Sequence, residues 1–128
     1  MSVEKASEDR HLIFQIGQLE IRLHAAEAMT DRAGWAIDAA IREPNADSVA
    51  AASIAVAEAK VLTTEIAIEA ENKFFELAGT RSAVGQPAYD RHWRNAHVHT
   101  LHDPVRWKYA AVGDYYLNGT KPQGTGQI

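Results

Sequence analysis

Cysteine is absent from this sequence of 128 residues, which excludes disulfide bridges and thiolate chemistry. The same absence excludes most structural zinc sites, because these depend on thiolate ligands. No apolar run approaches the ~20 residues that a membrane-spanning helix needs, so no membrane partner is expected. The charged amino-terminal segment lacks the apolar stretch of a secretory signal, and we therefore expect a cytoplasmic protein.

An excess of positive charge is also missing. Lysine and arginine number 13 against 17 aspartates and glutamates, which gives a formal net charge of −4. Domains that bind nucleic acid usually carry a basic face, so the composition disfavours that partner. The apolar content of 46% is close to the average of globular proteins, and the length fits one domain.

The first part of the chain predicts one long helix. Ser7 is expected at its start, with Glu8 and Asp9 in the first turn where the helix dipole favours negative charge. Pro44 ends it, because the residue before a proline is driven out of the helical region. Apolar residues follow one another at spacings of three and four, which is the period of a helix seam. They are Leu12, Ile16, Leu19, Leu23, Ala26, Ala33, Ile37 and Ala40.

A second long helix is predicted from a cap at Asn45 or Asp47 to about Ala78, followed by Gly79. It carries two apolar stripes with a seven-residue repeat. One stripe is Val49, Val56, Thr63, Ala70 and Leu77, and the other is Ile54, Val61, Ile68 and Phe75. Their offset places them about 140° apart, so this helix needs covering from two sides. The chain's own helices can cover one side, and the other predicts a further subunit or domain.

Two shorter helices complete the expected fold. One begins near Pro87 and ends about Leu101, and the next has Asp103 as its cap and Pro104 as its first residue. No segment shows the strict alternation of a strand. The sequence therefore predicts an all-α antiparallel helical bundle of two long and two shorter helices over residues 1–119, with a flexible tail at 120–128.

The segment Asp90–Tyr109 concentrates four of the six histidines and two of the three tryptophans. Three of these histidines, His92, His99 and His102, fall on roughly one helical face. We nevertheless predict no metal site, because the adjacent Asp103 is expected to serve as a cap and not as a ligand. A di-iron centre needs Glu-x-x-His pairs, which this sequence does not offer.

Three polar residues near the helix breaks have more than one interpretation. Arg81 follows a glycine-led break, where it can clamp an anion or neutralise the end of a helix dipole. His99 and His102 flank the break into the last helix. Each can act as a hydrogen-bond donor or general acid/base, or can be a core histidine bonded to a carbonyl. The residues by themselves leave these alternatives open.

Two segments carry a resemblance to a known family: AKVLTTEIAIEAENKFFELAGTRS at 59–82 and DRHWRNAHVHTLHDPVRWKY at 90–109. They resemble the C-terminal helical domain of acyl-CoA dehydrogenase-type flavoproteins, and most of all its monooxygenase branch, which includes dibenzothiophene monooxygenase. The resemblance covers essentially the whole chain. It implies a tetramer core that completes a flavin site, FMN or FAD, together with N-terminal and middle domains that are not in this sequence.

The resemblance also implies roles for single residues. Arg81, with Ser82 beside it, is similar to the arginine that reaches a flavin phosphate from a neighbouring subunit. His99 and His102 occupy the loop that faces the isoalloxazine ring, and His102 is expected to hydrogen-bond near its C4a/N5 edge. Acyl-CoA dehydrogenases have a glutamate base near this point, and Leu101–Pro104 stands there instead. His97 departs from the family pattern, which more often has an arginine.

The resemblance therefore implies the C-terminal part of a flavin-dependent monooxygenase that uses reduced flavin and oxygen and is inactive by itself. The alternative is a stand-alone helical module for oligomerisation or binding, without catalytic activity.

Overall fold

The computed structural model describes residues 5–79, 89–101 and 103–123. A short 3-10 helix, Ala6–Glu8, precedes four α-helices: α1 (Arg10–Arg42), α2 (Ala46–Ala78), α3 (Asp90–Leu101) and α4 (Val105–Asn118). No strand occurs in these ranges. The predicted all-α bundle of two long and two shorter helices is confirmed. No helix in the described ranges is both long and apolar enough to cross a membrane.

Polar side chains fix the ends of the long helices. The carboxylate of Asp9 accepts a hydrogen bond from the backbone N–H of His11 at 2.8 Å, so α1 begins three residues later than Ser7. Asn45 caps α2 and forms a reciprocal capping box with Ser48, at 2.9 and 3.0 Å. Gly79 follows α2 with a φ of 74°, a conformation that favours glycine. The end of α3 at Leu101 agrees with the sequence, whereas its predicted start at Pro87 lies outside the described residues.

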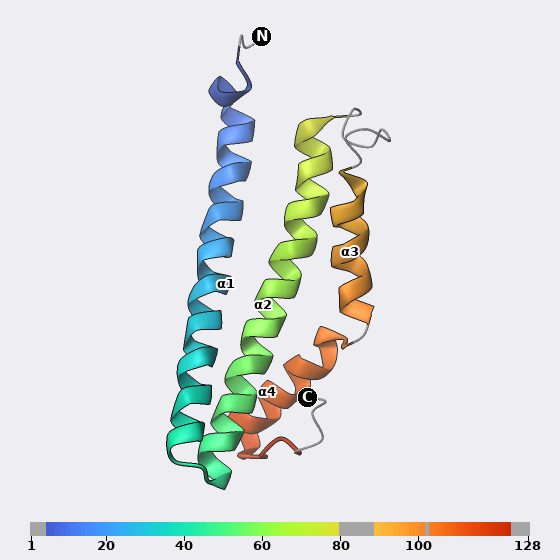
Figure 1. Ribbon diagram of the computed structural model, residues 1–128. Helices are drawn as coiled ribbons and strands as arrows, with labels where there is room; N and C mark the ends of the chain where they lie inside the picture. The colour runs from blue at the N-terminus through green and yellow to red at the C-terminus, as the bar shows by residue number, and fades with distance from the viewer. Residues whose placement is uncertain (1–4, 80–88, 102, 124–128) are drawn as a thin grey trace.

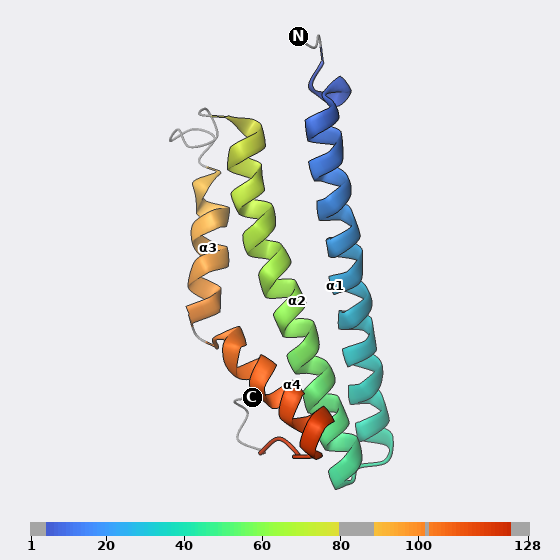
Figure 2. The ribbon, with the colours of Figure 1, turned by 180° about the vertical axis from the view of Figure 1, so that it is seen from behind.

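α2 is the central helix of a flat arrangement. α1 runs antiparallel along one side of it, α3 lies along the opposite side, and α4 crosses α2 obliquely near its N-terminal end (Figure 1). The view from behind shows the same order of helices (Figure 2). α2 consequently has two flanks covered by its own chain, and α4 covers part of one broad face, where Tyr116 interacts with Arg32 of α1.

The buried core between α1 and α2 is made of small residues. Ala33, Ala55 and Ala59 form it, with Met29 and Ala36 packed against it. Of the ten buried apolar residues in the described ranges, seven are alanines, which bury little more than a methyl group each. Eighteen large apolar residues in the same ranges are exposed. The chain thus keeps most of its large apolar surface on the outside.

The two predicted stripes of α2 meet different environments. Ile54 and Val61 are 1% and 5% exposed, on the same face as Asn72, which binds Trp93 of α3. Val49 and Val56, in contrast, are 52% and 43% exposed. The expectation that the chain's own helices cover one stripe and leave the other open is therefore confirmed at these positions.

The predicted seam of α1 is covered only in part. Ala26 and Ala33 are buried, whereas Ile16, Leu23 and Ile37 are 46%, 41% and 41% exposed. The contact with α2 is rotated toward Met29, Ala33 and Ala36, because small side chains allow the closest approach of the two backbones. The larger residues of the seam lie at the edge of the contact with α2 and stay partly exposed.

The start of α4 corrects one prediction. Pro104 occupies the cap position, and no side chain caps the helix. The carboxylate of Asp103 instead lies 2.6 Å from the ammonium of Lys108, which is 5% exposed. A buried ammonium is strongly destabilising without a counter-ion. The carboxylate of Asp103 therefore pairs with Lys108 and does not accept a hydrogen bond from the backbone at the start of α4.

The Asp103–Lys108 pair predicts an asymmetric effect on stability. Asp103→Ala leaves a buried cation without its partner, and we expect a loss on the order of 3 kcal/mol. Lys108→Met, and the double variant Asp103→Ala/Lys108→Met, should lose far less, because methionine fills the same space without charge. Urea unfolding followed by circular dichroism measures all three. Equal losses in Asp103→Ala and the double variant would contradict a charge effect.

Candidate functional site

Of the predicted site residues, His99 lies within the described part of the chain, whereas Arg81, Ser82 and His102 lie outside it. His99 is in the last turn of α3 and is exposed. Its Nε2 lies 2.9 Å from the ammonium of Lys60 on α2, a residue that sequence reasoning missed. No periodic signal links two residues that are 39 positions apart, so the sequence gives no indication of this pair.

The remainder of α3 is attached to α2 through Trp93. Its indole N–H donates to Oδ1 of Asn72 at 2.7 Å, and its ring lies 4.3 Å, centroid to centroid, from the ring of His97. The Nε2 atom of His97 is buried and has no hydrogen-bond partner in the described part of the chain. Buried polar atoms are nearly always satisfied, so this nitrogen is an exception within the described residues.

Tyr109 of α4 makes a third contact with α2. Its hydroxyl donates to the carboxylate of Glu65, and this hydrogen bond, together with partial burial, raises the pKa of Tyr109 above its ordinary value. Lys60, Glu65 and Asn72 therefore each hold a residue from the segment Asp90–Tyr109. This part of the site is a row of separate contacts along α2, and not one cluster.

Metal binding finds no support in the described residues. No three histidine, aspartate or glutamate side chains in residues 5–79, 89–101 and 103–123 gather closely enough to hold an ion. His24 faces Glu20 on its own helix at 3.5 Å, and His11 faces Glu76 at 3.8 Å. Both are exposed ion-pair contacts of the kind expected for solvated helix faces.

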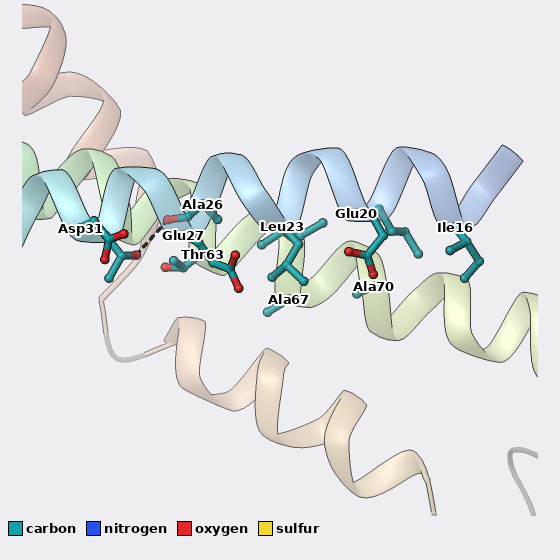
Figure 3. A pocket seen from close by; sticks show the side chains of 12 residues that line it. Ile16, Glu20, Leu23, Ala26, Glu27, Asp31, Thr63, Ala67 and Ala70 are labelled. Carbon is teal, nitrogen blue, oxygen red and sulfur yellow. Dashed lines mark hydrogen bonds between the residues drawn. The ribbon is translucent and has the colours of Figure 1, made fainter. Parts of the chain in front are cut away.

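A groove of about 530 Å³ runs between α1 and α2 (Figure 3). Its floor is apolar and includes Leu23, Ala67 and Ala70, and Thr30 bonds back to the carbonyl of Ala26 at 2.9 Å. Three acidic residues stand along its α1 side. They are Glu20, Glu27 and Asp31. Part of the apolar seam predicted on α1 lines this groove. The sequence pattern alone predicts that such a seam is covered by another helix, so it does not predict an open groove.

A second exposed apolar stripe lies on α1. Phe14, Ile21 and Trp35 are 60%, 72% and 70% exposed, and with Ala28 they repeat every seven residues. We call these four residues the outer stripe. Sequence reasoning missed it, although its repeat was readable. A regular apolar stripe of this kind is typical of a surface that another helix covers.

The family relationship follows from a comparison with known sequences. The profile of the family described as acyl-CoA dehydrogenase, C-terminal domain, matches residues 1–107. The chain belongs to this family. It is 34% identical over 123 residues to dibenzothiophene monooxygenase of Mycolicibacterium goodii and 29% identical over 124 residues to a probable FMNH2-dependent monooxygenase, SfnC, of Pseudomonas putida. Each match covers 94% of this chain but only 30% or 31% of the relative.

Solved structures agree with this assignment. Dibenzothiophene monooxygenase (TdsC) of Paenibacillus sp. A11-2 superposes with a TM-score of 0.91 at 31% identity, over 100% of this chain and 34% of that one. Methanesulfinate monooxygenase MsuC of Pseudomonas fluorescens gives 0.91 at 31% identity, over 97% and 33%. The FMN-bound form of TdsC gives 0.87 at 33% identity, over 94% and 31%. The chain thus spans about a third of the length of these relatives, and the resemblance seen in its sequence is confirmed.

The Glu65–Tyr109 contact predicts a measurable titration. Because the bond favours the protonated phenol, its stabilisation is complete below the ordinary pKa of 10.0 and is lost as the pH rises through the raised value. In Glu65→Gln we expect the pKa of Tyr109 to fall back toward 10.0. Phenolate absorbance, corrected by subtraction of a Tyr109→Phe titration, measures it. Glu76→Gln, three helical turns further along α2, is the matched control and should leave this titration unchanged. A pKa that is the same in Glu65→Gln and wild type would contradict the bond.

Proposed function

We propose that this chain is the C-terminal helical third of a flavin-dependent monooxygenase that uses reduced FMN and O2. The observation that carries the proposal is the match of nearly the whole chain, at 31–34% identity, to monooxygenases that include the FMN-bound TdsC. FMN is favoured over FAD by the names of these relatives. In this function the bundle completes a flavin site whose other walls come from the N-terminal and middle domains.

The distribution of apolar residues supports the proposal that this chain is one domain of a larger protein. Large residues such as Trp35, Val49 and Val56 are exposed, while the buried interior is mainly alanine. Soluble monomers seldom leave contiguous apolar surfaces of this extent uncovered. We assign the groove between α1 and α2, with the neighbouring Val49–Val56 stripe, to the missing domains. The outer stripe of α1 is assigned to a second subunit.

The described residues fit a flavin, which presents ring nitrogens and carbonyl oxygens as acceptors. Lys60 and His99 supply donors at one end of α3. Arg81 and Ser82 would hold the flavin phosphate, and His99 and His102 would hydrogen-bond to the ring edge. Reduced flavin supplies the electrons for oxygen. These histidines would orient it and hold or deliver protons beside it.

The test is made on the complete flavoprotein that contains this chain. His102→Ala should lower kcat for oxygen-dependent turnover with reduced FMN by about 100-fold or more, the usual contribution of a positioned acid or base. Arg81→Ala should raise the Kd for FMN, because the phosphate loses its guanidinium. Stopped-flow and titration measurements report the two effects.

The matched control for these variants is His24→Ala, an exposed histidine of α1 that faces Glu20. It should keep wild-type turnover and FMN affinity. Undiminished turnover in both His102→Ala and Arg81→Ala would show that the assigned roles are wrong. Absence of any flavin-dependent turnover in the complete protein would favour the alternative, a helical oligomerisation module.

Self-association through the outer stripe gives a second prediction. The double variant Ile21→Ser/Trp35→Ser should reduce the oligomer seen by sedimentation velocity, with little change in thermal unfolding of the separated subunits, since both side chains are at least 70% exposed. Leu117→Ser is the control, because Leu117 is 84% exposed and lies outside the stripe. A wild-type chain that stays monomeric at high concentration, or an unchanged oligomer in the double variant, would refute this interface.

A further inference from the structure

Lys60 has an unusual partner for a lysine. Its ammonium carries three donors and no acceptor, and it lies 2.9 Å from Nε2 of His99. Within residues 5–79, 89–101 and 103–123 it forms no ion pair with a carboxylate, although Lys73 and Lys121 do so at 2.8 Å. Because the ammonium can only donate, Nε2 of His99 must be the acceptor. The proton of the neutral imidazole is then on Nδ1.

We propose that Lys60 is a positioning residue that holds His99 as its Nδ1–H tautomer. This inference rests on the proposed function, in which His99 meets the flavin or its substrate. With Nε2 occupied by Lys60, the Nδ1–H group is the donor that the ring can offer to another molecule. The direction of proton donation at His99 is thus set from α2, and not by the ligand.

The position of Lys60 suits this role. It lies on the central helix between the buried residues Ala59 and Val61, and its own side chain is half-buried, so its backbone is held by packing on both flanks. The other contacts between histidines and charged groups differ: His92 accepts a long contact of 3.4 Å from its neighbour Arg91 on the same helix, and two histidines face carboxylates. His11 and His24 face the carboxylates Glu76 and Glu20, which would accept from a protonated Nε2. His99 is the described histidine whose Nε2 faces a lysine.

The direct test is NMR of the chain with ¹⁵N-labelled histidine, in which two-bond correlations separate protonated from unprotonated ring nitrogens. In the wild type we expect an unprotonated Nε2 and a protonated Nδ1 for His99, assigned with His99→Gln. Lys60→Met should shift the population toward Nε2–H, whereas Lys60→Arg should retain the wild-type pattern, because arginine also only donates. His24 is the internal reference and should not change. Circular dichroism checks that each variant folds.

Two results would overturn the inference: a wild-type His99 that already carries its proton on Nε2, or an unchanged tautomer in Lys60→Met. A purely structural role of Lys60 predicts the second result, since loss of packing alone does not select a ring nitrogen.

Turnover of the complete flavoprotein separates this inference from the proposed function. Lys60→Met should lower kcat on the order of 10- to 100-fold with little change in KM, and Lys60→Arg should recover most of the loss. A tautomer shift without any change in kcat would support the action of Lys60 on His99 and overturn the catalytic assignment of His99. A fall in kcat without a tautomer shift would overturn the positioning role of Lys60.

Discussion

The fold depends on α2, because this is the helix that packs against both flanks of the layer. Its side toward α1 is lined by alanines such as Ala55 and Ala59, which let two long helices approach closely. Its other side carries Ile54 and Val61, which lie under α3 and α4. Because α2 packs against other helices on two sides, a rotation of α2 about its own axis would break contacts on both. The orientation of α2 therefore determines where α3 and α4 can pack.

The two broad faces of the layer differ in chemistry. On one face, acidic residues of α2 receive donors from both flanks: Arg22 and Arg32 of α1 bind Glu69 and Glu58, and Tyr109 of α4 binds Glu65. Exposed pairs of this kind contribute about 0–1 kcal/mol each, so they set the orientation of the flanking helices more than the stability. The opposite face holds the groove, whose apolar floor is bordered by acidic residues of α1.

Local signals predicted much of this architecture. The caps at Asn45 and Gly79 and the helix-ending Pro44 depend on neighbouring residues, which a sequence displays directly. The two stripes of α2 were readable because their period is regular. The contact of Lys60 with His99 and that of Asp103 with Lys108 were not readable, because each depends on which helix faces which in space. The flavin-binding roles of Arg81, Ser82 and His102 came from the family resemblance and stay predictions.

The contact between His99 and Lys60 shows how a packed helix can hold an exposed polar side chain of a neighbouring helix. A catalytic group must be held to within a fraction of an ångström, and residues anchored on a packed helix are held better than residues in a loop. Here the anchor is Lys60 on α2, the helix with the most buried residues in the described ranges. In the proposed function, α2 would thus carry both the apolar surface that other domains cover and the lysine that orients His99.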